Sequence, residues 1–379
     1  MRGTCAALIG LVVVGCASGT RSEAPAGRGS AQRTSASTAS GAVPAGLVAL
    51  SDQVLAAVQP CVTSAVDALV DHDAFAREMT THAPAMPPQV AAFVRTGSLA
   101  ASKLCAWIGG AERVEHLRFG HRDGESLVVL RAVTASGTDY YELRAQELAG
   151  RWRIRDVYAY TTDLSLSAYF AELLLAPSDV ASASVMNDVN RLDRAGRPAE
   201  ALARLDQLGP AMLANRAMQS QRVGFASRIS IPVYLAALDE RRRVLPSRTL
   251  APSEQFFRAM LTGDHAAALA SVDELQGRVG ADPAMLATRA GILAARGGVG
   301  DLERAAALED EAVAGAPTVR WTHLTKAVVA VARQDWAGAL AALDGLRTHL
   351  GVRLTEAELR AAPGLAPLVE TPAYAAWHE

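Results

Sequence analysis

Residues 300–317 read GDLERAAALEDEAVAGAP, and this stretch decides how the C-terminal half of the chain folds. Gly300 marks a turn, and small and apolar residues at helical spacing follow it, with Ala305 five positions on. The pattern recurs at Gly196 with Ala201, Gly263 with Ala268, and Gln334 with Ala339. Successive alanines are 67, 37 and 34 positions apart, close to two, one and one times a period of about 34 residues. Residues 183–379 are therefore predicted to be an all-α array of helical hairpins.

The stretch 300–317 resembles the second helix of a tetratricopeptide repeat (TPR) and departs from it at Glu309, where the family usually has an apolar residue. The aligned alanine stands where the two helices of a hairpin cross closely, and stacking of hairpins supplies the core. The large aromatic and glycine positions of each first helix are largely missing, so the repeats are degenerate. A helix pair around Phe225 and Ala237 is expected to fill the gap of two periods.

The resemblance implies a short superhelix that binds other proteins along a concave face, lined mainly by the first helix of each hairpin. Matching positions select Asn190, Phe257, Trp321, Leu324 and Val328. This apolar set with one amide does not resemble the lysine and asparagine clamp that holds peptide carboxylates. The alternative is that Phe257, Trp321 and Leu324 pack against neighbouring helices or the preceding domain.

A different pattern occupies residues 47–178. Helical periodicity over Leu47–Val70 and over 88–107 gives way to four strand-like segments, separated by the turn signals Asp123-Gly124, Ser136-Gly137 and Ala149-Gly150. The predicted strands are 114–120, 126–134, 139–148 and 152–160. A further helix begins at Asp163 and ends before Pro177. The segment is predicted to be an α+β domain in which helices cover an antiparallel meander.

This order of elements, with the stretches YYEL at 140–143 and GRWRIRDVY at 150–158, resembles the NTF2-like group of α+β cones. That group contains ketosteroid-isomerase-like enzymes and also noncatalytic binders of ligands or proteins. The resemblance therefore implies a fold and leaves the chemistry open.

An enzyme in such a cone needs a carboxylate or histidine in an apolar cavity, opposite a group that donates to an oxyanion. The candidates are Asp73, His82, Tyr140, Glu142, Asp156 and Tyr158. Strict alternation would place Asp156 on one face with Trp152, Ile154, Tyr158 and Tyr160. Each candidate also has a structural interpretation, such as a charge pair for Glu142 with Arg144 or a core aromatic for Tyr158.

The N-terminus has one positive residue, Arg2, before an apolar run from Ala6 to Gly15 that ends at Cys16. The run is about half the ~20 residues of a membrane-spanning helix, which indicates a secretory signal. It resembles a bacterial lipoprotein signal, which implies that residues 1–15 are removed and that Cys16 carries lipid. The alternatives are an ordinary cleaved signal and an uncleaved anchor.

Residues 16–46 lack apolar periodicity and are predicted to be a disordered tether. Ala17 and Ser18 differ from the aspartate that retains many lipoproteins at the inner membrane, so the resemblance implies the outer membrane of the cell envelope. Cys61 and Cys105 remain as a pair in an oxidising compartment and are predicted to form a disulfide, with two separate buried thiols as the alternative. The sequence has no CxxC motif or cofactor fingerprint, so neither a metal nor a cofactor is expected.

The 379 residues carry a formal net charge of −2, and the tight basic run Arg241–Arg243 is expected to be a solvated helix end. No nucleic-acid partner is expected. Tyr374 and Trp377, in a short final helix, are predicted to cap the array. The favoured function is that of a noncatalytic, membrane-anchored adaptor that binds a protein partner through its repeats. The alternative is a small-molecule binder or isomerase-like enzyme that uses the α+β cone.

Overall fold

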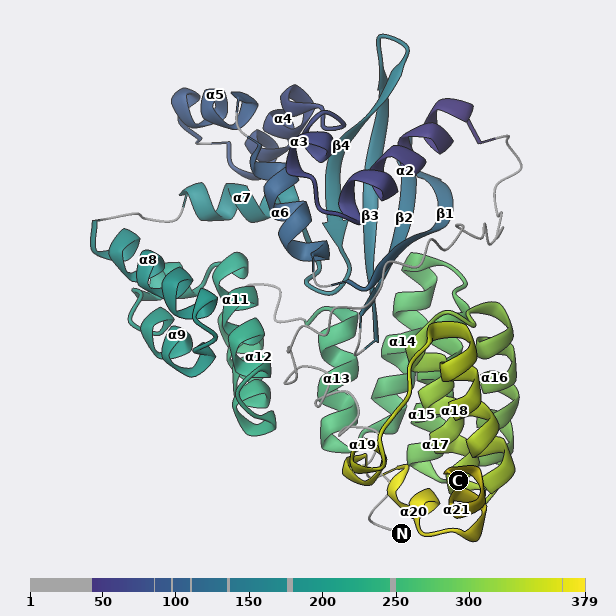
Figure 1. The fold of residues 1–379 in the computed structure, drawn as a ribbon. Coiled ribbons are helices and arrows are strands. Elements are labelled where there is room, and N and C mark those ends of the chain that lie inside the picture. Colours follow the sequence, from purple (N-terminus) through teal and green to yellow (C-terminus); the bar gives the residue numbers. More distant parts are fainter. Residues whose placement is uncertain are drawn as a thin grey trace. The chain divides into compact units, whose positions relative to one another are not determined.

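The computed structural model describes residues 43–84, 86–96, 98–109, 111–134, 137–175, 180–245, 250–362 and 364–378. The chain divides into two compact units. We call the unit that contains the described residues of 43–132 and 139–254 the sheet unit, and the unit that contains the described residues of 133–138 and 255–379 the C-terminal unit. An α+β part is followed along the chain by an all-helical part (Figure 1).

Five strands form one sheet in the sequential order β1-β2-β3-β4-β5. They are β1 (Arg113–Arg122), β2 (Glu125–Thr134), β3 (Gly137–Leu148), β4 (Arg151–Ala159) and β5 (Leu164–Ser165). The pairs β3–β4 and β4–β5 are antiparallel. Asp123-Gly124 and Ala149-Gly150 both have positive φ, as two-residue hairpin turns require. The predicted antiparallel meander is thus confirmed, whereas Ser136 of the third turn signal lies outside the described residues.

Helices cover one face of this sheet. They are α2 (Ala45–Val58), α3 (Thr63–Asp67), α4 (His72–His82), α5 (Pro88–Thr96), α6 (Leu99–Ile108) and α7 (Leu166–Leu175). Leu47, Leu50 and Val54 of α2 join Tyr141, Leu143 and Ile154 of the sheet in one buried core. The prediction of one continuous helix over 47–70 is wrong. The chain turns at Cys61, whose φ is 52°, and forms α2 and α3 instead. The segment 88–107 likewise forms two helices, α5 and α6, rather than one.

The sheet unit continues into further helices, of which α11 packs against α7. They are α8 (Val180–Arg194), α9 (Pro198–Leu205), α10 (Pro210–Leu213), α11 (Arg216–Ser227) and α12 (Ile231–Val244). Glu172 of α7 accepts a hydrogen bond from Asn215 Nδ2 at 2.7 Å through its backbone carbonyl, and its side chain pairs with Arg216 Nε at 2.6 Å. Tyr169 and Ala217 share a buried apolar cluster at the same junction. The expected helix pair around Phe225 and Ala237 is confirmed as α11 and α12.

Apart from the adjoining ends of β2 and β3, the C-terminal unit is helical, and the unit boundary falls within α13 (Pro252–Thr262). The helices that follow are α14 (His265–Val279), α15 (Pro283–Arg296), α16 (Asp301–Gly315), α17 (Arg320–Ala332), α18 (Trp336–Leu350), α19 (Glu356–Ala361), α20 (Ala366–Val369) and α21 (Pro372–His378). Neighbouring helices from α14 to α18 pack in sequence order. The final helix, α21, packs on α18, where Trp377 Nε1 donates to Asp344 Oδ2 at 3.2 Å and Tyr374 is buried. The capping role of Tyr374 and Trp377 stays a prediction, for which this packing supplies the contact.

One local structure recurs at the four aligned positions. Gly196, Gly263, Gly300 and Gln334 all have a left-handed backbone, with φ of 68°, 76°, 74° and 58°. The alanine five residues later in each case, Ala201, Ala268, Ala305 or Ala339, is 0% exposed. The sequence repeat is therefore also a repeat of turn conformation and of a fully buried alanine.

Candidate functional site

A bulge in β4 decides which side chains gather on the second face of the sheet, away from the helix-covered core. Arg144 pairs with Asp156, but the next residue of β3, Ala145, pairs with Ile154, so Arg155 is an extra residue. Ile154 and Val157 both join the apolar core. Asp156 therefore points to the opposite face, and the expectation that it shares a face with Ile154 is wrong. A bulge of this kind reverses the alternation of side chains beyond it.

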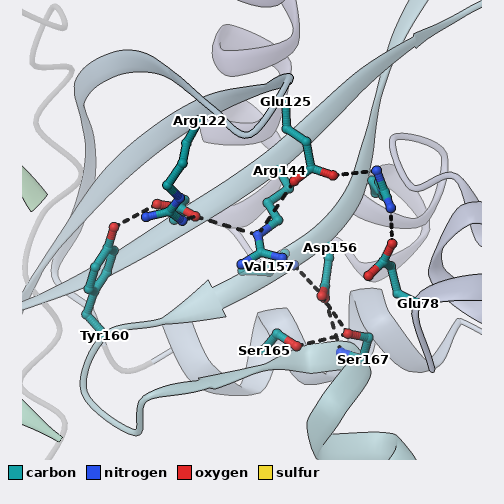
Figure 2. Close-up of polar contacts among 11 residues, drawn as sticks. Glu78, Arg122, Glu125, Arg144, Asp156, Val157, Tyr160, Ser165 and Ser167 are labelled. Atoms are coloured by element: carbon teal, nitrogen blue, oxygen red, sulfur yellow. Dashed lines mark hydrogen bonds and ion pairs between the residues drawn. The ribbon is translucent and has the colours of Figure 1, made fainter. Parts of the chain in front are cut away.

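Glu142 lies at the centre of a polar cluster on this second face. Its side chain is 0% exposed. Arg122 is ion-paired with Oε1, and Arg144 Nε lies 3.6 Å from the same oxygen. Tyr160 donates its hydroxyl hydrogen to Oε2 at 2.7 Å. Figure 2 shows Arg122, Arg144 and Tyr160 directed toward one another on this face. A buried carboxylate is thus compensated by two guanidinium groups and one phenol.

The cluster extends along the sheet through alternating charges. Arg144 Nε lies 3.9 Å from Glu125 Oε2. Arg155, which the bulge turns outward, is ion-paired with both Glu125 and Glu78. Glu78 belongs to α4, so this pair of contacts ties a helix to the bulged strand. Figure 2 shows Glu125 and Glu78 on either side of the same guanidinium group.

Asp156 acts at the start of α7. Its Oδ2 accepts a hydrogen bond from Ser167 Oγ at 2.5 Å, and its Oδ1 accepts from the backbone N–H groups of Ser167 at 3.1 Å and Val157 at 2.8 Å. The first N–H groups of a helix lack partners within the helix, and a carboxylate there is favourable. Burial raises the pKa of Asp156, and the hydrogen bonds from Ser167 and Val157 oppose that rise.

The chemistry of this face follows from these contacts. Burial and the negative charge of Glu142 both raise the pKa of Tyr160, so its hydroxyl remains protonated and donates. The carboxylate oxygens of Glu142 and Asp156 are already engaged by donors of the protein itself. As arranged, the face links strands, α4 and α7, and it presents no free base to a substrate at these two carboxylates.

The remaining catalytic candidates lie apart from one another. Asp73 is at the surface of α4 with Arg95 Nε 3.3 Å away, and His82 is exposed at the end of the same helix. Tyr140 is buried, and the hydroxyl of Tyr158 donates to Asp163. The structure brings together Glu142 and Asp156 on one face of the sheet and leaves Asp73 and His82 at exposed positions of α4.

The predicted groove residues differ in how much surface they present. Leu324 and Val328 are 5% and 3% exposed, so in this arrangement they contribute to the core of the C-terminal unit. Phe257 is half-buried beside Phe256, and Trp321 is half-buried against a cluster that includes Ala316 and Val319. Asn190 is exposed on α8 in the sheet unit. Phe257 and Trp321 therefore retain apolar surface for a partner, and the groove stays a prediction.

A separate hollow lies between α14, α15 and α16. It is lined by Gln276, Leu286, Arg289, Arg304, Ala307, Leu308 and Glu311. Leu286 and Leu308 are half-buried, whereas Arg304, Ala307 and Glu311 are exposed. This surface combines an apolar centre with charges of both signs at its edge, and the sequence pattern alone did not single it out.

Arg241 and Glu254 form a buried ion pair that the sequence interpretation missed. Arg241 is 3% exposed, which corrects the expectation that the triplet Arg241–Arg243 is solvated. Its Nε lies 3.3 Å from Glu254 Oε2, and it donates to Ser220 Oγ at 2.7 Å and to the carbonyl of Thr162 at 3.2 Å. Burial raises the pKa of Glu254, and the charge of Arg241 opposes that rise.

Cys61 and Cys105 are close together and carry free thiols in the structure. Burial and the neighbouring Cys61 raise the pKa of the Cys105 thiol to about 11, and the hydroxyl of Thr63 lies 3.9 Å from its sulfur. The thiol of Cys105 is therefore protonated at neutral pH. The disulfide stays a prediction, for which the structure supplies the proximity.

The sequence matches no protein-family model and no curated protein. Cys16 and residues 1–42 lie outside the described part of the chain. Within that part, no helix combines the length and apolar character needed to cross a membrane, and no group of three or more His, Cys, Asp or Glu side chains is placed to hold a metal ion.

Proposed function

We propose that this protein is a noncatalytic adaptor of the bacterial cell envelope, anchored through lipid on Cys16, which binds a protein partner through TPR-like repeats. The observation that carries the proposal is the recurrence of one left-handed turn and one fully buried alanine at four aligned positions. Stacked hairpins of this kind form extended surfaces whose common use is protein binding.

In this proposal the sheet and its covering helices form an NTF2-like domain. Helices that precede the sheet, the sequential strand order and one helix-covered face support that assignment. The alternative, a ligand-binding or isomerase-like cone, has less support. Its strongest candidates, Glu142 and Asp156, lie on the opposite face from the apolar core and hold internal partners.

The binding test places a photo-crosslinking amino acid at single positions of the full chain in intact envelopes. Phe257 represents the predicted groove, Ala307 represents the hollow between α14 and α16, and Val299, exposed on the turn between α15 and α16, is the control. We expect a discrete protein crosslink from Phe257 and none from Val299. A crosslink from Ala307 alone would move the partner to the hollow, and no crosslink at either site would contradict the adaptor.

The anchoring test compares the wild type with Cys16→Ser. Lipid on the mature N-terminal cysteine would be detected as an acylated N-terminal peptide by mass spectrometry, and the protein would fractionate with outer membranes. We expect Cys16→Ser to lose both properties. An unmodified N-terminal peptide from the wild type would contradict the lipid anchor and leave the binding test unaffected.

A further inference from the structure

Helix α17 is packed between α16 and α18, and each of its two interfaces contains a buried side chain that can gain or lose a proton. Glu309 of α16 is 0% exposed and His323 of α17 is 1% exposed. Alanine, leucine and valine side chains of α15 to α17 form one buried apolar cluster, and most of the buried residues of α17 are apolar. A charge on either group would be costly in such surroundings.

Glu309 has no hydrogen-bond partner for either carboxylate oxygen among the residues that the structure describes. It is the residue at which the stretch 300–317 departs from the repeat pattern. Neighbouring positions on the same face of α16, Ala305 and Ala312, are also fully buried. Burial holds the pKa of Glu309 well above its usual range.

The charged groups around Glu309 do not compensate it. The positive charge of Lys326 of α17 lowers the pKa of Glu309. However, Lys326 Nζ is ion-paired with Asp310 Oδ1 at 2.6 Å, on the outside of the helix pair. Asp310 itself opposes ionisation of Glu309. The two arginines of α15 are engaged elsewhere, Arg289 with Asp273 and Arg296 with Asp301.

His323 faces α18. Its Nε2 lies 2.7 Å from the carbonyl oxygen of Pro317, and its ring stacks on His349 with centroids 5.6 Å apart. Gly345 of α18 allows this approach, because a Cβ at that position would lie 2.5 Å from His323 Nδ1. Burial, with the nearby His349 and Lys326, lowers the pKa of His323 even though the Pro317 carbonyl opposes the effect. A neutral ring that donates through Nε2 fits these contacts.

We propose that α17 is a pH-sensitive element, which packs closed on α16 and α18 while Glu309 and His323 are both uncharged and opens locally when either becomes charged. Glu309 becomes charged by losing a proton on the alkaline side. His323 becomes charged by gaining one on the acidic side. The exposed surface of this part of the repeat array therefore depends on pH.

The sign of each effect follows from linkage. The folded pKa of Glu309 is raised, so its contribution is most favourable below its unfolded pKa and is lost as pH rises through the folded pKa. The folded pKa of His323 is lowered, so closed packing is favoured above the unfolded value of 6.5 and is lost as pH falls toward the folded pKa. Ionisation of Glu309 therefore opens α17 as pH rises, and protonation of His323 opens it as pH falls.

Hydrogen exchange of the full chain, followed by mass spectrometry and corrected for intrinsic exchange at each pH, tests the alkaline side. One linked proton changes the opening equilibrium by up to about tenfold per pH unit. We expect protection of α17 to fall with that dependence as pH rises in the wild type, and to be independent of pH in Glu309→Gln and Glu309→Leu. Glu311→Gln, an exposed acid on the same helix, is the matched control and should behave as the wild type.

The proposal is overturned on this side if Glu309→Gln and the wild type share one pH profile. Because Glu309→Leu replaces the carboxyl with an apolar side chain, it keeps the test valid if the amide variant folds poorly. On the acidic side, His323→Gln should abolish the loss of protection, whereas His349→Gln should retain it. Titration of the His323 ring by NMR in the wild type gives a second readout, and a midpoint at or above 6.5 would contradict the acidic half.

Discussion

Asp156 of β4 and Ser167 of α7 are joined by two hydrogen bonds, one from the serine hydroxyl at 2.5 Å and one from its backbone N–H at 3.1 Å. The carboxylate thereby fixes the first turn of a helix from a strand eleven residues earlier. We expect Asp156→Ala to lower the free energy of unfolding by about 2–4 kcal/mol, because it leaves buried donors unpaired. Asp156→Asn keeps one acceptor oxygen and should cost less.

Urea denaturation of the full chain measures this effect. Asp73→Ala is the matched control, because Asp73 is an exposed acid whose contact with Arg95 is at the surface. It should leave the unfolding midpoint nearly unchanged. Equal effects at the two positions would show that the contact between Asp156 and α7 has no special importance.

The ion pair between Arg241 and Glu254 makes a second prediction. Arg241→Met removes the cation and leaves a carboxyl buried without its charged partner, so we expect a loss of about 3–5 kcal/mol in the free energy of unfolding. Because burial raises the pKa of Glu254, protonation of the glutamate should relieve part of this loss as pH falls. Denaturation at several pH values checks both statements.

Arg242 supplies the control for that experiment, since it is adjacent in sequence but exposed. Arg242→Met should leave stability nearly unchanged at every pH. A similar loss for both variants would mean that the basic run acts as a whole and that the buried pair does not.

At Gln334 we expect a substitution that raises the free energy of unfolding. It has a left-handed backbone with φ of 58° at the position where the three aligned repeats have glycine. Since glycine adopts this conformation without the steric cost of a Cβ, Gln334→Gly should raise the free energy of unfolding by up to about 1 kcal/mol. Arg333→Gly, whose φ is −85°, should not stabilise, and the two melting temperatures compared with the wild type decide the matter.

The thiol pair predicts a redox-dependent stability. If Cys61 and Cys105 are bridged in the protein isolated from the envelope, reduction should lower the free energy of unfolding by about 3–4 kcal/mol, because the bridge restricts the unfolded chain. Thermal unfolding with and without reductant measures this difference. Alkylation of both cysteines in denatured, unreduced protein would rule out the bridge.

The capping helix predicts that the C-terminal unit depends on its last residues. Removal of residues 363–379 uncovers α18 and deletes the contact between Trp377 and Asp344, so the melting temperature and solubility should both fall. Asp344→Ala, which loses only the hydrogen bond, should have a smaller effect. An unchanged melting temperature after the truncation would contradict the capping role.

Periodicity in the sequence was sufficient for the strands and for the all-helical part that follows them, because both depend on local turn residues and on the spacing of apolar side chains. The same information could not locate the bulge at Arg155, since one extra residue in a strand has no composition signal. That single residue moves Asp156 from one face of the sheet to the other, and with it the expected site.

Burial of charged residues was also beyond the sequence pattern. Nothing in the local sequence distinguishes Arg241 from Arg242 and Arg243, which are the same amino acid. Only the fold brings Glu254, Ser220 and Thr162 to the guanidinium group of Arg241. Glu309 is the opposite case. The repeat pattern marked it as a departure, and the structure places it fully buried without a hydrogen-bond partner among the described residues.

Glu172 and its contacts with Asn215 and Arg216 determine where the protein can be divided for experiment. A polypeptide stopped at Pro177, where the sequence pattern changes, would retain α7 but lose the helix that covers Tyr169 and satisfies the Glu172 carboxylate. Such a fragment would expose an apolar surface around Tyr169 and leave the half-buried Glu172 carboxylate without Arg216. Apparent binding by the fragment would then reflect nonspecific association through the cut surface, so assays of the sheet unit should carry the chain through α13, which contains Glu254, the partner of Arg241.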